Sequence, residues 1–167
     1  MIRVGQKKIL RNSIDVADTY YDIASRDEFS AKILRELGLY NQAGYFYVQA
    51  MEKFIKSCIA NKIDLIKPFY ADKVKSNMKH SLKSACDFLI EIFASNDDLL
   101  KEQMKKQLAE DILQGIYSMD LNNDLRYPKY VDNYNDYSFL NLSEFDCARM
   151  EDILVGLKKY LKDLSNR

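Results

Sequence analysis

Apolar residues recur along most of the chain every three or four positions, the spacing of an α-helix rather than of a β-strand. The first such run covers residues 9–24 and predicts an amphipathic helix. Ser25 follows it at the head of a Ser-x-x-Glu capping box, which predicts that a second helix starts there and runs to about Leu37. These signals divide the chain into an N-terminal helical extension, residues 1–24, and a helical domain, residues 25–167.

The clearest helical pattern lies between Asn41 and Asn61. It follows Gly38, which is suited to end the preceding helix in a left-handed turn. Small side chains in its apolar stripe allow a neighbouring helix to approach closely. The stripe contains Ala43, Tyr47, Ala50, Phe54 and Cys58.

Weaker signals place the next helix. Residues 63–77 contain Pro68 and are predicted to form a connection. Ser76 or Asn77 is then expected to cap a helix that ends near Ala94.

The second half of the chain alternates helix signals with polar segments. After a stop signal at residues 95–98, apolar positions stay in helical step over residues 100–116, which predicts another helix. Residues 120–141 are rich in Asn, Asp and Tyr and are predicted to form a long loop, a kind of segment that is often functional. Ser143 is expected to cap a closing helix. The predicted fold is all-α: an up-and-down four-helix bundle with an extra N-terminal helix.

Composition and charge narrow the function. The 25 basic and 25 acidic residues give no net charge, which argues against a protein that coats nucleic acid by electrostatics alone. Three scattered cysteines and one histidine favour reduced thiols over a zinc site. The sequence contains no recognisable cofactor-binding motif, so we expect no cofactor. The N-terminus lacks the apolar core of a signal peptide, and no apolar stretch is long enough for a bilayer. We therefore expect a cytoplasmic protein without membrane association.

Four segments, in order, resemble the HEPN domain family. Residues 39–56 contain Tyr-Asn-Gln-Ala and Gln-Ala-Met-Glu-Lys, similar to that family's second helix, and residues 79–82 read Lys-His-Ser-Leu, similar to the start of its third helix. Residues 125–128, Leu-Arg-Tyr-Pro, look like its Arg-Tyr-Pro loop, and the segment capped by Ser143 resembles its closing helix. The resemblance covers about residues 25–164. It implies a four-helix bundle, usually dimeric, with roles in prokaryotic toxin–antitoxin, antiphage or nucleotide-handling systems.

Many members of this family are metal-independent ribonucleases with an Arg, a polar residue and a His within one or two helical turns. This chain departs from that pattern, because no Arg closely precedes His80, its only histidine, and no His follows Arg126. The matched group resembles the branch for which nucleotide binding is the usual proposal. His80 has the chemistry of a general acid or base, with Lys79 or Arg126 as a supporting cation, but a structural role at a helix start is the favoured interpretation.

Arg126 has two candidate roles. A carboxylate on a mostly apolar helix needs a partner, so Arg126 is expected to form a bidentate bridge to Glu52 and to pin the Tyr-rich loop to the bundle. The functional alternative is that Arg126 binds a phosphate beside Lys53 or Lys56.

Tyrosines near Arg126 complete the candidate site. They are suited to stack on a nucleobase or on single-stranded RNA, but an interface or packing role is the favoured interpretation. They are Tyr127, Tyr130, Tyr134 and Tyr137. The residues expected to bind a ligand are Lys53, Lys56, Lys79, His80, Arg126, Tyr127 and Tyr130.

Three functional hypotheses remain open. The favoured one is a non-catalytic HEPN-like module that forms a homodimer and binds a nucleotide, an RNA or a cognate protein such as a nucleotidyltransferase-type antitoxin. The second is a divergent ribonuclease toxin, which requires His80 and Arg126 to lie close together in a basic cleft. The third is a structural helical adaptor with a large exposed apolar patch.

Overall fold

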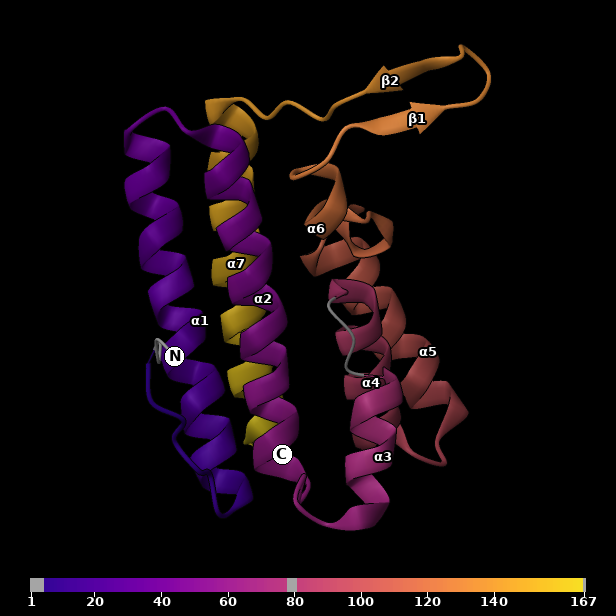
Figure 1. Cartoon of the computed structure of the whole chain (residues 1–167). Coiled ribbons are helices and arrows are strands. Elements are labelled where there is room, and N and C mark those ends of the chain that lie inside the picture. The colour runs from indigo at the N-terminus through magenta and orange to yellow at the C-terminus, as the bar shows by residue number, and fades with distance from the viewer. Residues whose placement is uncertain (1–4, 78–80, 167) are drawn as a thin grey trace.

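A computed structural model describes residues 5–77 and 81–166, and it confirms the predicted all-α bundle. Three long helices lie side by side: α1 (Ser13–Glu36), α2 (Tyr40–Lys62) and α7 (Glu144–Ser165) (Figure 1). Shorter helices form the rest of the bundle on the far side of α2. They are α3 (Pro68–Asn77), α4 (Leu82–Ala94) and α5 (Asp98–Lys106).

Helix α1 is continuous through Ser25, so the predicted helix boundary and capping box at this residue are wrong. The Ser25 hydroxyl donates instead to the carbonyl oxygen of Tyr21, one turn back, at 2.9 Å. The buried positions of α1 lie at seven-residue intervals: Ala17, Ala24 and Ala31 are all fully buried. Packing of this alanine stripe against the neighbouring helix outweighs the local capping signal.

Helix α2 is the centre of the bundle and confirms the predicted helix. Gly38 precedes it with a φ of 75°, the left-handed conformation expected of a glycine that ends a helix. Fourteen of its residues are buried, and they face α1, α4 and α7 in turn. A helix that is buried on so many sides has few positions for charged residues, and those that it holds need partners.

The segment predicted as a connection contains a helix, α3. Pro68 is its first residue, where the missing N–H costs nothing and the fixed φ suits a helix. The cap of α4 is Ser81, whose hydroxyl accepts from the Ser84 N–H at 3.3 Å. The prediction of Ser76 or Asn77 as this cap is therefore wrong.

The predicted helix over residues 100–116 breaks up after α5. It continues as a π-helical turn, η1 (Gln107–Ile112), and then as a 3₁₀ turn, η2 (Ile116–Ser118). Between them Gln114 and Gly115 adopt left-handed backbone conformations, with φ of 47° and 92°. These turns bring Tyr117 back to the bundle, where its hydroxyl donates to Asp87 of α4.

Residues 120–141, predicted as a loop, contain a short helix and a β-hairpin. The helix is α6 (Leu121–Asp124), and the strands are β1 (Lys129–Val131) and β2 (Asp136–Ser138), which pair antiparallel. The hairpin projects away from the helices (Figure 1). The next helix, α7, begins after Ser143, which is its predicted cap and forms a capping box with Asp146.

Ion pairs join α1 to α7 along their exposed edges. The carboxylate of Glu28 accepts from Lys158 of α7 at 2.8 Å and from Lys32 at 3.0 Å, and Arg35 donates to Glu151 of α7 at 2.7 Å. Burial raises the pKa of Glu28, but the two lysines outweigh it and hold the pKa below its ordinary value.

We expect Glu28 to make the fold sensitive to acid. A carboxylate with a lowered folded-state pKa stabilises the fold above its unfolded pKa, and this contribution of about 1 kcal/mol is lost as the pH falls below about 5. Glu28→Gln should therefore flatten the fall in the free energy of unfolding between pH 6 and pH 3.5, measured by urea titration with circular dichroism. Glu36→Gln, on the exposed face of the same helix, is the control and should leave the slope as in the wild type. If Glu28→Gln leaves the pH dependence of the free energy of unfolding unchanged, Glu28 does not contribute to the acid sensitivity of the fold.

Candidate functional site

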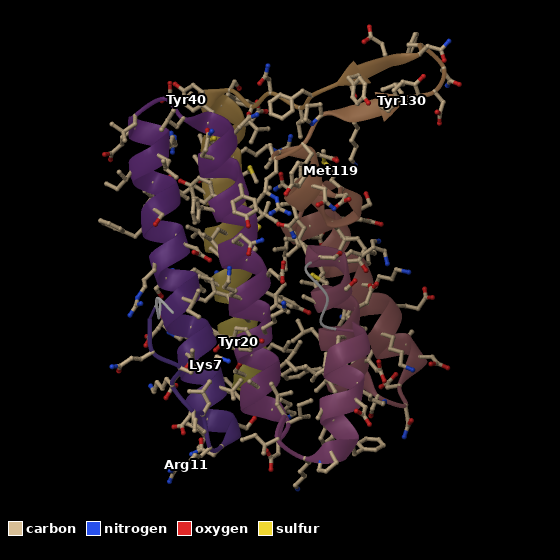
Figure 2. The ribbon with its side chains drawn as sticks, viewed as in Figure 1. Lys7, Arg11, Tyr20, Tyr40, Met119 and Tyr130 are labelled. Carbon is tan, nitrogen blue, oxygen red and sulfur yellow. The ribbon has the colours of Figure 1, made fainter. Side chains whose placement is uncertain are left out.

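The hairpin carries a set of exposed aromatic rings outside the bundle. Tyr130 and Tyr137 face each other across the two strands, with ring centroids 5.4 Å apart in an edge-to-face arrangement. Tyr134 at the tip is 81% exposed. Figure 2 shows Tyr130 on the hairpin, with Met119 on the segment beneath it. Tyr130 and Tyr137 therefore contact each other, and all three rings are largely exposed to solvent.

The hairpin and the segment that follows it are acidic. Residues 130–148 contain two aspartates in the hairpin and two acidic residues at the start of α7, but no lysine or arginine. The nearest base, Lys129, forms ion pairs with Asp124 and, at 3.8 Å, with Asp120. The surface around the tyrosines therefore has an excess of negative charge.

Arg126 anchors the base of the hairpin, but not to Glu52 as predicted. Its Nε donates to the carbonyl oxygen of Asn122 at 2.8 Å, one turn back along the chain. Its guanidinium lies over two rings, 5.3 Å from the centroid of Tyr45 on α2 and 5.0 Å from that of Tyr127. Stacking on Tyr45 ties the hairpin base to α2, in place of the predicted bridge to Glu52.

Glu52 belongs to a buried polar network between α2 and α6. It is 1% exposed and forms an ion pair with Lys56, one turn along the same helix. Asn122 of α6 donates to the other Glu52 oxygen at 3.3 Å and accepts from Gln49 at 2.7 Å. The network fixes α6, and through it the hairpin, on the central helix.

Lys53 and Lys56 both have carboxylate partners. Lys53 donates to Asp27 of α1 at 2.6 Å and to Gln49 at 2.8 Å, while Lys56 is buried against Glu52. Their positive charges are neutralised within the fold, and phosphate binding beside Arg126 stays a prediction.

The other predicted ligand residues divide into two groups. Tyr127 and Tyr130 lie with Arg126 at the hairpin, as expected for neighbours in the sequence. Lys79 and His80 lie outside the described residues. The proximity of His80 to Arg126, on which the ribonuclease hypothesis depends, therefore stays a prediction.

Cysteines offer no reactive site in the described part of the chain. Cys58, Cys86 and Cys147 are unpaired and buried, and burial raises the pKa of each thiol. They stay protonated at neutral pH and are poor nucleophiles. Across residues 5–77 and 81–166, no three His, Cys, Asp or Glu side chains gather as metal ligands, and no helix could span a membrane.

Sequence reasoning missed one further feature, a groove between α1, α2 and α7. It has a volume of about 630 Å³ and is lined by Tyr21, Phe54 and lysines of α7. The only local signal is the Lys158-Lys159 pair with Lys162 one turn on. Nothing in the sequence relates these lysines to aromatic residues more than a hundred positions away.

Comparisons with protein-family models, with curated proteins and with solved structures found no match. Function is therefore argued from the side chains of this chain.

Proposed function

We propose that this chain is a binding module that docks on a basic protein partner through its projecting hairpin. The observation that carries the proposal is the group of exposed aromatic rings on an acidic segment outside the bundle. Aromatic side chains are enriched in protein interfaces, where their burial supplies much of the binding energy.

The hairpin is poorly explained as a purely structural element. An isolated two-stranded hairpin is marginal in water, and this one keeps Tyr134 and Tyr137 in solvent at 81% and 69% exposure. Its base, in contrast, is held firmly by Arg126 and by the network around Asn122. A rigid base with exposed rings lowers the entropic cost of docking a partner.

Charge selects the class of partner. Asp132 and Asp136 flank the exposed rings, and the one lysine of the two strands, Lys129, is already paired with Asp120 and Asp124, so phosphate backbones are repelled. A surface rich in Arg and Lys suits both features, because its cations pair with carboxylates and stack on tyrosine rings. The resemblance to HEPN domains suggests the kind of partner, a cognate protein such as a nucleotidyltransferase-type antitoxin in a defence system.

A photo-crosslinking experiment tests this proposal. Benzoylphenylalanine is placed at Tyr134 in the full chain, in cells of the source organism, and irradiated. We expect one discrete protein adduct that is lost in the Asp132→Lys/Asp136→Lys variant, because charge reversal repels a basic partner. The control places the same probe at Leu99 on α5, which is 82% exposed and should give no such adduct.

The mass of the adduct identifies which kind of molecule binds the hairpin. A second protein of basic surface supports the proposal. An adduct of twice the chain mass identifies a homodimer contact instead, and an RNA adduct identifies nucleic acid. Equal labelling at Tyr134 and Leu99, or an adduct that survives charge reversal, would contradict the proposal.

Nucleotide or RNA binding is the second candidate, and one observation favours it. The Arg126 guanidinium is exposed, lies between the rings of Tyr45 and Tyr127, and has only a carbonyl and an amide oxygen as hydrogen-bond acceptors in the described chain. A cation flanked by rings can bind a phosphate while a base stacks on Tyr127.

A further inference from the structure

A groove separate from the hairpin combines an aromatic wall with a basic rim. It runs between the second half of α2, the first half of α1 and the end of α7, and has a volume of about 630 Å³. Tyr21 and Phe54 form its wall, with ring centroids 5.3 Å apart and planes at 74°. Leu161 adds an apolar contact surface.

Three lysines of α7 line the same groove. Lys158 is already engaged, since it donates to Glu28 at 2.8 Å and lies 5.0 Å from the centre of the Phe54 ring. Lys159 and Lys162 are exposed and form no ion pair within the described residues. The described residues that line the groove include no aspartate or glutamate.

This excess of positive charge costs free energy unless something offsets it. Like charges one turn apart on a helix repel, and the lysines gain only modestly from the C-terminal end of the α7 dipole. The Cys58 thiol at the groove is kept neutral, because burial raises its pKa, and supplies no negative charge. A bound anion would offset the repulsion.

We propose that this groove binds a small organic anion that has a flat apolar body and a phosphate, sulfonate or carboxylate group. The flat body stacks beside Tyr21 on the wall formed with Phe54, and the anionic group pairs with Lys159 and Lys162. Pockets of a few hundred cubic ångströms with apolar walls and a few convergent polar groups are the usual form of small-molecule sites. The site does not depend on the proposed role of the hairpin.

The probe for this site is 1-naphthyl phosphate, whose own fluorescence reports binding in titrations at low ionic strength. We expect saturable binding of one molecule per chain. The Lys159→Gln/Lys162→Gln variant should bind about tenfold more weakly, as two charge pairs of roughly 0.7 kcal/mol each are lost. Neutral 1-naphthol should bind more weakly than the phosphate to the wild type and equally to both proteins.

A matched pair of lysines controls for general electrostatic attraction. Lys105→Gln/Lys106→Gln removes two exposed lysines of α5 and should leave the affinity within about twofold of the wild type. If this control weakens binding as much as the groove variant, or if the groove variant binds like the wild type, the proposal is wrong. Urea titration of each variant checks that it is folded, so that a weaker affinity for naphthyl phosphate reports the loss of the lysine charges and not the loss of the fold.

Discussion

Lys56→Met is expected to lower the free energy of unfolding by about 3–5 kcal/mol, the cost of leaving one member of a buried ion pair behind. Lys56 and Glu52 are 5% and 1% exposed, and their ion pair lies against α6. Met fills much of the space of the lysine stem, so the loss reports the removal of the Lys56 charge from beside the buried Glu52 carboxylate more than a cavity.

Urea unfolding followed at 222 nm measures this effect. The double variant Glu52→Gln/Lys56→Met should recover part of the loss, because the charge that was left without its cation is removed as well. Lys101→Met is the control, since its ion pair with Asp98 is exposed and is worth well under about 1 kcal/mol. A loss in Lys56→Met no larger than in Lys101→Met would show that the buried pair contributes little.

Ala24→Leu is the second change for which a large effect is expected. Ala24 is fully buried in the alanine stripe of α1, and α1 packs against α2 along most of its length. Three added carbon atoms have no space unless the helices separate, which costs typically 1–3 kcal/mol or more. The same displacement would stretch the hydrogen bond from Ser57 of α2 to the Ala17 carbonyl, now 2.9 Å.

Thermal and urea unfolding again provide the measurement. Arg26→Leu, two positions along the same helix on its exposed face, adds an apolar side chain without crowding and should stay within about 0.5 kcal/mol of the wild type. If both variants unfold alike, the close approach of α1 and α2 does not depend on small residues at this interface.

The candidate site was predicted only in its local parts. Arg126 was expected to pin the Tyr-rich segment to the bundle through Glu52, because a carboxylate on a mostly apolar helix needs a partner. Its partner was wrong for a physical reason: Lys56 lies one turn from Glu52 on the same helix and already satisfies the carboxylate. Arg126 then pairs locally with the Asn122 carbonyl and stacks on Tyr45.

Local signals also competed with packing. Ser25 has the sequence of a helix cap, but the buried alanines on both sides of it hold α1 in one piece. The hairpin was missed for the opposite reason, since residues 129–138 alternate too briefly, and are too polar, to indicate strands. The two strands pair because the chain reverses direction between Val131 and Asp136.

The sequence by itself determined the helical class, the extent of α2, the glycine turn at Gly38 and the capping box at Ser143, because each depends on residues within a few positions of one another. Tertiary structure alone decided the packing of Asn122 against the buried Glu52, the projection of the hairpin and the groove that joins Tyr21 to Lys159. These features depend on which helix faces bury together, and burial is settled by the whole chain at once.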